Sequence, residues 1–152
     1  MRWLLAVCAA LVVAPAASAA VPNPCTLLTN AEATKLLGTR IVARELTGSP
    51  VYRLCRWSGK NVALAGSTQH VQRTLMVSVA RVTRAQFEEN KTKAPKTTGI
   101  GGVGEAAYTL SQGGTKYLNV WHRGFTLELV ATFVTAPLDV EKQAAAAAVK
   151  RL

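Results

Sequence analysis

The first helical pattern in the chain follows a clear start signal. Thr29 and Glu32 have the spacing of a capping box, in which each side chain bonds the backbone amide of the other residue. Leu36 and Leu37 follow at helical spacing, and Gly38 supplies the left-handed residue at which many helices end. The pattern predicts a short amphipathic helix.

Three runs with the composition of β-strands follow, at residues 41–46, 51–57 and 74–82. The sequence Thr-Gly-Ser-Pro at residues 47–50 has turn chemistry and joins the first two runs. The polar stretch 58–72 is interpreted as a loop with at most a short strand inside it.

The second half of the chain repeats this order in outline. Thr83 and Gln86 form a second capping box, which opens a helix of two or three turns. After a loop at residues 95–104, strands separated by glycine turns are expected at 105–110, 116–122 and 125–134. Pro137 then begins a final helix that is rich in alanine.

The last predicted strand alternates cleanly between apolar and polar side chains. One face carries Phe125, Leu127, Leu129, Ala131 and Phe133, and the other carries Thr126, Glu128 and Thr132. The whole order is helix, three strands, helix, three strands, helix. It predicts a single α+β domain with an antiparallel sheet of about six strands and helices on one face.

The N-terminus has the anatomy of a cleavable signal peptide. Arg2 precedes an apolar run at residues 3–13, and small residues follow as far as Ala20. The run is shorter than the roughly 20 apolar residues that a membrane-spanning helix needs. We therefore assign residues 1–20 to a signal peptide and residues 21–152 to one exported domain, periplasmic or extracellular, without a transmembrane segment.

The cysteines indicate a structural role rather than a reactive one. Cys8 lies inside the apolar run and follows Val7, where a lipid-attachment site needs a small residue, so a lipoprotein is the less favoured alternative. Loss of the signal peptide leaves Cys25 and Cys55, an even number that favours one disulfide in an oxidising compartment. Two unpaired buried thiols are the alternative. The chain has no C-x-x-C motif, which argues against redox activity.

The composition is basic, with 18 Lys and Arg against 8 Asp and Glu, a formal charge of +10 that becomes +9 without Arg2. Such a charge attracts anionic lipids, envelope polymers or nucleic acid. The basic residues are scattered, however, and the densest group is Lys91, Lys93 and Lys96 in a predicted loop. We therefore favour a solvated surface over a dedicated polyanion site. We expect no specific nucleic-acid partner and at most weak association with anionic surfaces.

Several short motifs resemble those of a broad family of small exported bacterial proteins of unknown function, many of them actinobacterial lipoproteins. The motifs are a Pro-Cys-x-Leu-Leu-Thr segment at residues 24–29, followed by Glu32 and a Leu-Gly helix end, then Cys55-Arg56-Trp57, and a Gly-x-Gly-x-x-Ala-Tyr element at residues 102–108. The resemblance implies a Cys25–Cys55 bridge and an α+β sheet fold, and it implies no activity. The missing lipid-attachment site departs from many members of that family.

The chain carries no motif that predicts catalysis, a cofactor or a metal. Residues 99–104 match the letters of G-x-G-x-x-G, but the dinucleotide motif needs a strand before it and a helix after it, so we interpret the segment as a turn without nucleotide affinity. His70 and His122 do not make the three ligands of a catalytic zinc site. Glu88 and Glu89 are adjacent, so they do not share a helix face.

An aromatic strand supplies the candidate binding surface. In the strand at residues 116–122, Tyr117, Asn119 and Trp121 share one face, whereas Leu118 and Val120 share the other. If Leu118 and Val120 face the helices, the aromatic face points outward beside Arg123 and would suit a carbohydrate or a protein. The competing interpretation covers this face as well and places Trp121 in the core.

These observations favour an exported, non-catalytic binding or interaction module, including an inhibitor or immunity-type protein, whose partner is an unknown protein or envelope component. The alternatives are a polyanion or envelope-surface binder that acts through its charge, and an enzyme with an unrecognised site.

Overall fold

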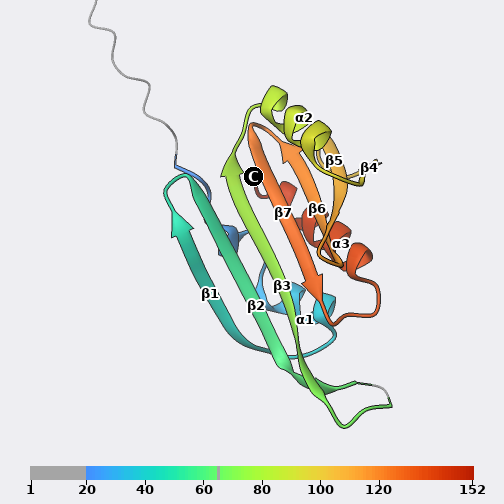
Figure 1. The fold of residues 1–152 in the computed structure, drawn as a ribbon. Coiled ribbons are helices and arrows are strands. Elements are labelled where there is room, and N and C mark those ends of the chain that lie inside the picture. Colours follow the sequence, from blue (N-terminus) through green and yellow to red (C-terminus); the bar gives the residue numbers. More distant parts are fainter. Residues whose placement is uncertain (1–19, 65) are drawn as a thin grey trace, which may run out of the picture.

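The computed structural model describes residues 20–64 and 66–152, which form one seven-stranded sheet with three α-helices and a 3-10 turn (Figure 1). Cys8 and all of the predicted signal peptide except Ala20 lie outside the described residues. No helix within the described ranges is long and apolar enough to cross a bilayer. The elements are η1 (Pro24–Thr26), α1 (Asn30–Leu37), β1 (Ile41–Ser49), β2 (Tyr52–Ala63), β3 (His70–Arg81), α2 (Arg84–Lys93), β4 (Thr97–Ile100), β5 (Ala106–Gln112), β6 (Thr115–His122), β7 (Phe125–Thr132) and α3 (Pro137–Val149).

Two antiparallel meanders make up the sheet. β1, β2 and β3 form the first, β4 to β7 form the second, and the two meet where β3 pairs with β7. The strand order is therefore β1-β2-β3-β7-β6-β5-β4, and every neighbouring pair is antiparallel. The predicted α+β class and antiparallel sheet are confirmed.

The prediction of about six strands is wrong by one. β4 (Thr97–Ile100) lies in the predicted loop and pairs with β5 at the edge of the sheet. It has four residues, too few to show an alternation, and it becomes a strand only through its partner. The predicted loop at residues 58–72 is also too long, because β2 extends to Ala63 and β3 begins at His70.

Phe133 does not join the apolar face of the last strand. β7 ends at Thr132, and the next residue, Phe133, has a φ of 56° and is 57% exposed. The left-handed backbone at this position turns the chain out of the sheet. The predicted strand end at residue 134 is therefore two residues too late.

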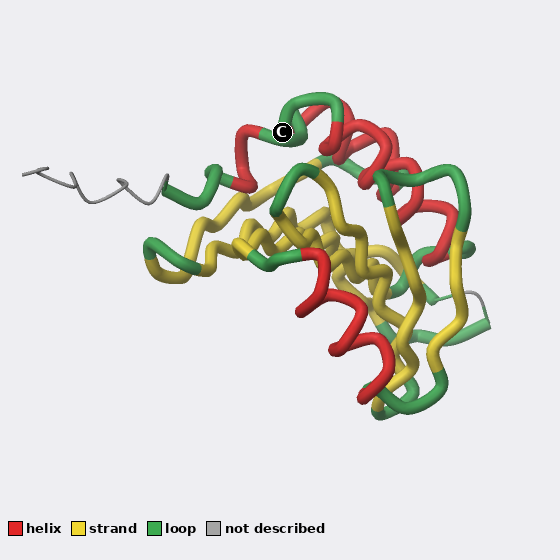
Figure 2. The backbone as a smooth tube through the Cα atoms, turned by 90° about the horizontal axis from the view of Figure 1, so that it is seen from above, coloured by secondary structure: helices red, strands yellow, loops and turns green. Residues whose placement is uncertain are grey.

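One face of the sheet carries the main core. Both capping boxes form as predicted. The hydroxyl of Thr29 accepts from the backbone amide of Glu32, and the hydroxyl of Thr83 accepts from the backbone amide of Gln86. In return, the side chains of Glu32 and Gln86 accept from the backbone amides of Thr29 and Thr83. α1 and α3 pack on the same face (Figure 2). The fully buried side chains beneath them come from both meanders and include Trp57, Leu75, Val77, Val79, Leu118, Val120, Leu127 and Leu129.

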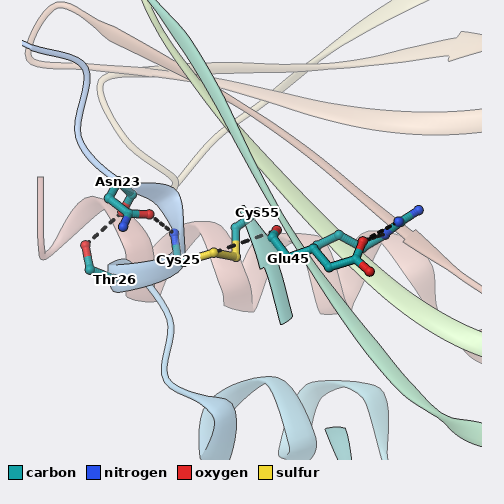
Figure 3. The surroundings of a disulfide bond; sticks show 6 residues. Asn23, Cys25, Thr26, Glu45 and Cys55 are labelled. Carbon is teal, nitrogen blue, oxygen red and sulfur yellow. Dashed lines mark hydrogen bonds and ion pairs between the residues drawn. A yellow bond between two sulfur atoms is a disulfide. The ribbon is translucent and has the colours of Figure 1, made fainter. Parts of the chain in front are cut away.

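A disulfide between Cys25 and Cys55 fixes the N-terminal segment to β2, which confirms the predicted bridge (Figure 3). The η1 turn that presents Cys25 is capped by Asn23, whose side-chain oxygen accepts from the Cys25 amide at 2.9 Å. At the other end of the chain, Arg151 donates to the carboxylate of Glu32 and to the carbonyl of Leu27. Both ends of the described chain are thus held over the same face of the sheet.

The prediction that all helices cover one face is wrong, because α2 lies on the opposite side (Figure 2). Phe87 is the buried residue of α2, and its ring contacts that of Tyr108 on β5, with centroids 5.1 Å apart. Apart from Phe87 and Ala85, α2 is polar, so its sequence contains no apolar stripe that could indicate which face it covers. Lys91 and Lys93 belong to this helix and not to a loop.

Glu141 of α3 is completely buried under the sheet. Its Oε1 accepts from the amide of Ala131 at 2.9 Å, at a point where β6 no longer runs beside β7, because the last β6–β7 pair is Leu118 with Leu129. Its other oxygen is buried without a partner among the described residues. Burial raises the pKa of Glu141 to about 7, so the side chain is mostly the neutral acid below that pH.

We predict that Glu141 makes the protein less stable as the pH rises. A carboxyl group whose pKa is raised from 4.5 to about 7 contributes its full stability below pH 4.5 and loses it as the pH approaches about 7. The loss should be about 2–4 kcal/mol of unfolding free energy. Urea unfolding at several pH values should show this fall in the wild type and not in Glu141→Gln. The exposed Glu89→Gln is the control, and an equal pH dependence in all three proteins would contradict the prediction.

Candidate functional site

The side of the sheet that faces away from α1 and α3 is only partly covered. We call it the open face. α2 covers it over β5, where Phe87 packs on Tyr108. No described helix other than α2 lies on the open face, so its part over β2, β3 and β7 is largely uncovered (Figures 1 and 2). A binding surface formed by the middle of the sheet would therefore lie here.

A hollow of about 200 Å³ opens on this face beside α2. Two neighbouring rows of cross-strand residues form its floor: Ser78, Glu128 and Asn119 in one, and Tyr52, Ala80 and Thr126 in the other. Val82 and Asn90 complete its described lining. We call it the Glu128 hollow, after the only charged residue in that lining.

Glu128 lies at the centre of this floor, opposite Ser78 on β3 and Asn119 on β6. Its carboxylate has no hydrogen bond or ion pair with any described residue. Burial raises the pKa of Glu128, because the charged form loses hydration without gaining a partner. Burial also raises the pKa of the neighbouring Tyr108, and the negative charge of Glu128 adds to that effect. An unpaired carboxylate in a central strand costs stability, which suggests that it serves another purpose.

Two further polar groups, just beneath the surface of the hollow, have no partner among the described residues. Asn119 is only 6% exposed, and its Nδ2 is buried without a hydrogen bond. The Thr126 hydroxyl is likewise buried and unpaired. Buried polar groups in proteins are nearly always hydrogen-bonded. Two buried unsatisfied side-chain groups, those of Asn119 and Thr126, thus lie beside the half-buried, unpaired carboxylate of Glu128, and this combination is the strongest signal of a ligand site.

The aromatic strand is only partly the surface that the sequence predicted. Leu118 and Val120 do face the helices and are fully buried, so Tyr117, Asn119 and Trp121 lie on the open face. Of these three, Asn119 lines the hollow, and Tyr117 and Trp121 do not. Arg123 lies in the β6–β7 turn with a φ of 48° and is exposed there.

Trp121 holds α2 against the sheet. Its indole N–H donates to the carbonyl of Val82 at 2.8 Å, just before the helix. The Arg84 guanidinium lies 5.2 Å from the centroid of its ring, a cation–π distance. Its ring is thus engaged with the α2 connection and is not a free aromatic anchor.

A histidine–carboxylate pair lies near the same end of β6. His122 Nδ1 is 3.4 Å from Glu105 Oε1, and the same oxygen accepts from the backbone amide of Arg123 at 2.9 Å. Glu105 therefore stabilises the β6–β7 turn through its contacts with His122 and with the Arg123 amide. His70, the other histidine, is exposed at the start of β3. Within the described part of the chain, no group of three His, Cys, Asp or Glu side chains could hold a metal ion.

The glycine-rich segment lacks the geometry of a dinucleotide site. Its first residues belong to β4, and the strand β5 follows it, so no helix opens from it to hold a phosphate. Gly104 has a φ of 61°, and a Cβ there would lie 2.9 Å from the Trp121 carbonyl oxygen. This glycine is required by a close approach of two backbones. That the segment binds no nucleotide stays a prediction.

Sequence reasoning found Asn119 but missed the rest of the hollow. Glu128 carried a readable signal, because it is a lone carboxylate between Leu127 and Leu129 in a strongly apolar strand. Tyr52 and Ser78 carried none, since their place beside Glu128 depends on how distant strands pair.

Comparison of the chain with protein-family models, with curated proteins and with solved structures gives no match.

We predict that Asn119→Leu keeps or raises the thermal stability. The substitution removes a buried donor that has no partner among the described residues and leaves a side chain of similar size, so the unfolding free energy should stay equal or rise by about 1 kcal/mol. The control is Thr74→Val, which should destabilise, because it removes the partner of the Thr132 hydroxyl. Thermal melts of both variants test this, and a large loss for Asn119→Leu would show that Asn119 is structural.

We predict that Trp121→Ala destabilises the protein by about 2–4 kcal/mol, because it removes a partly buried ring and leaves the Val82 carbonyl without its donor. Tyr117→Ala, on the same face of β6, should cost clearly less. Thermal melts measure both, and a melting temperature near that of the wild type for Trp121→Ala would restore Trp121 as a candidate anchor.

Proposed function

We propose that this protein is a non-catalytic binding module whose ligand occupies the Glu128 hollow. The observation that carries the proposal is the set of three polar side chains without partners among the described residues, Glu128, Asn119 and Thr126, that lines one open hollow. Each of them costs stability in the folded chain, and a ligand that pairs with them offsets that cost.

The composition of the hollow favours binding over catalysis. Its described lining contains a single carboxylate and no His, Lys or Cys. Glycoside hydrolysis by a carboxylate pair needs a second acid within about 5–9 Å, and none is among the described lining residues. Ser78 lies opposite Glu128, but a serine nucleophile needs a base that accepts its hydrogen bond, and these two described side chains form none.

Binding of polyanions through the net positive charge is supported less well than binding in the Glu128 hollow. The densest basic group of the sequence is largely engaged within α2, where Lys91 contacts Glu88 at 3.9 Å and Lys93 contacts Glu89. Arg56 and Arg151 are also in ion pairs, with Glu45 and Glu32. We therefore keep the polyanion binder as the second candidate, with the net positive charge of the chain as its support.

We also propose that the module works outside the cytoplasm. The Cys25–Cys55 disulfide supports this, because such bonds persist in oxidising compartments. The same bond supports the proposed resemblance to small exported bacterial proteins, whose motifs imply it.

The proposal predicts that small polar probes perturb the hollow. In nitrogen–proton NMR spectra, titration with a panel of methyl glycosides, capped amino acids, ATP and inorganic phosphate should shift the amides of Asn119, Thr126 and Glu128 for at least one probe. Glu128→Gln should weaken that binding, and Glu89→Gln, the same change on an exposed helix, should not.

Two results would contradict it. Shifts that map only to other surfaces would remove the hollow as the site. A bound probe that is chemically altered during the titration would show catalysis instead.

A further inference from the structure

We propose that the ligand of the Glu128 hollow is a neutral, polyhydroxylated molecule, most simply one sugar ring of a glycan. This rests on the proposed function and adds the chemical class of the ligand. It follows from which groups the hollow offers and which it lacks.

The first step excludes anions. The chain carries an excess of positive charge, yet no Lys, Arg or His is among the described residues that line the hollow. Glu128 is the only charged group among them. A phosphate or carboxylate would meet a like charge without any cation to balance it.

The second step disfavours a lone cation. An ammonium or guanidinium group would pair with Glu128, but it has only donors. It would leave Nδ2 of Asn119, itself a buried donor without a partner among the described residues, as unsatisfied as before. The ligand must bring an acceptor to Asn119 and a donor to Glu128.

The third step uses the spacing of these two residues. Asn119 and Glu128 lie directly opposite each other on β6 and β7, so their Cβ atoms are about 5 Å apart. Hydroxyl groups on adjacent carbons can serve both, because each hydroxyl both donates and accepts. A peptide unit fits less well, since its N–H and C=O point in opposite directions across a trans bond.

The fourth step concerns the rest of the lining. Tyr52, which is 43% exposed, and the apolar side chains of Ala80 and Val82 border the polar floor. A sugar ring has polar edges and apolar C–H faces, so it matches a hollow with both kinds of surface. Nδ2 of Asn119 lies below the surface of the hollow, so its contact with a ligand requires a rotamer change in a lining side chain.

The test compares a sugar with a cation at the same site. Methyl glycosides of several hexoses and pentoses, Nα-acetyl-lysine methylamide and Nα-acetyl-glutamine methylamide are titrated separately, with the amides of the hollow as the readout. We expect at least one glycoside to bind, with an affinity that changes little between low and high salt, because no ion pair is involved.

Asn119→Asp distinguishes a glycoside from a cationic ligand, because it should change their affinities in opposite directions. It replaces the donor by a second carboxylate, so it should weaken a glycoside about tenfold or more and strengthen the lysine probe. Asn61→Asp, the same change at an exposed position of β2, is the control. If repulsion between the new carboxylate and Glu128 unfolds the Asn119→Asp variant, Asn119→Leu removes the donor without adding charge and should weaken the glycoside by a similar factor.

The outcomes distinguish this inference from the proposed function. Binding of the lysine probe alone, strengthened by Asn119→Asp, would overturn the glycan and leave the binding module intact. Binding of the glutamine probe alone would replace the sugar with a primary amide. If no probe shifts the amides of the hollow, both proposals fail.

Discussion

The pairing of β3 with β7 is the contact on which the rest of the structure depends. It joins residues 74–81 to residues 125–132 across about a third of the chain, and without it each meander would be a separate small sheet. On one face, this pairing brings Val77 beside Leu129 at the centre of the core. On the other face, it brings Ser78 beside Glu128. The same register therefore creates both the core and the hollow.

The unequal cover of the two faces follows from what the helices can bury. α1 and α3 present apolar and alanine-rich surfaces, and the disulfide and the Arg151–Glu32 ion pair hold both ends of the described chain over the same side. The one large apolar residue of α2 is Phe87, so this helix covers only the part of the open face around Tyr108. The uncovered part borders α2 directly, and this is where the hollow lies.

Local patterns predicted the parts of this fold that local chemistry determines. The capping boxes at Thr29 and Thr83 are found as expected. The pairing of Cys25 with Cys55, predicted from the cysteine count and the resemblance, is also found. Alternation placed Leu118 opposite Tyr117 and left open which of them faces the helices; the structure buries Leu118. The face that α2 covers and the strand at β4 were not predictable in this way, because each depends on contacts with a partner distant in the sequence. The hollow has the same origin: Tyr52, Asn90 and Glu128 come from three elements, and alternation gives the face of a side chain without giving its neighbours.

Two buried or half-buried glutamates, both with a raised pKa, show why Glu128 and not Glu141 indicates a site. Glu141 of α3 is fully buried, and its Oε1 accepts from the amide of Ala131 where β6 leaves β7, so the fold gives one of its oxygens a structural role, while the other is buried without a partner among the described residues. Glu128 bonds no backbone group and no side chain of the described residues, and it borders an open hollow. A glutamine or an apolar residue would fit the sheet at that position at least as well. One oxygen of Glu141 is therefore satisfied by the fold, whereas the carboxylate of Glu128 has no partner among the described residues and borders the hollow in which the proposed ligand would bind.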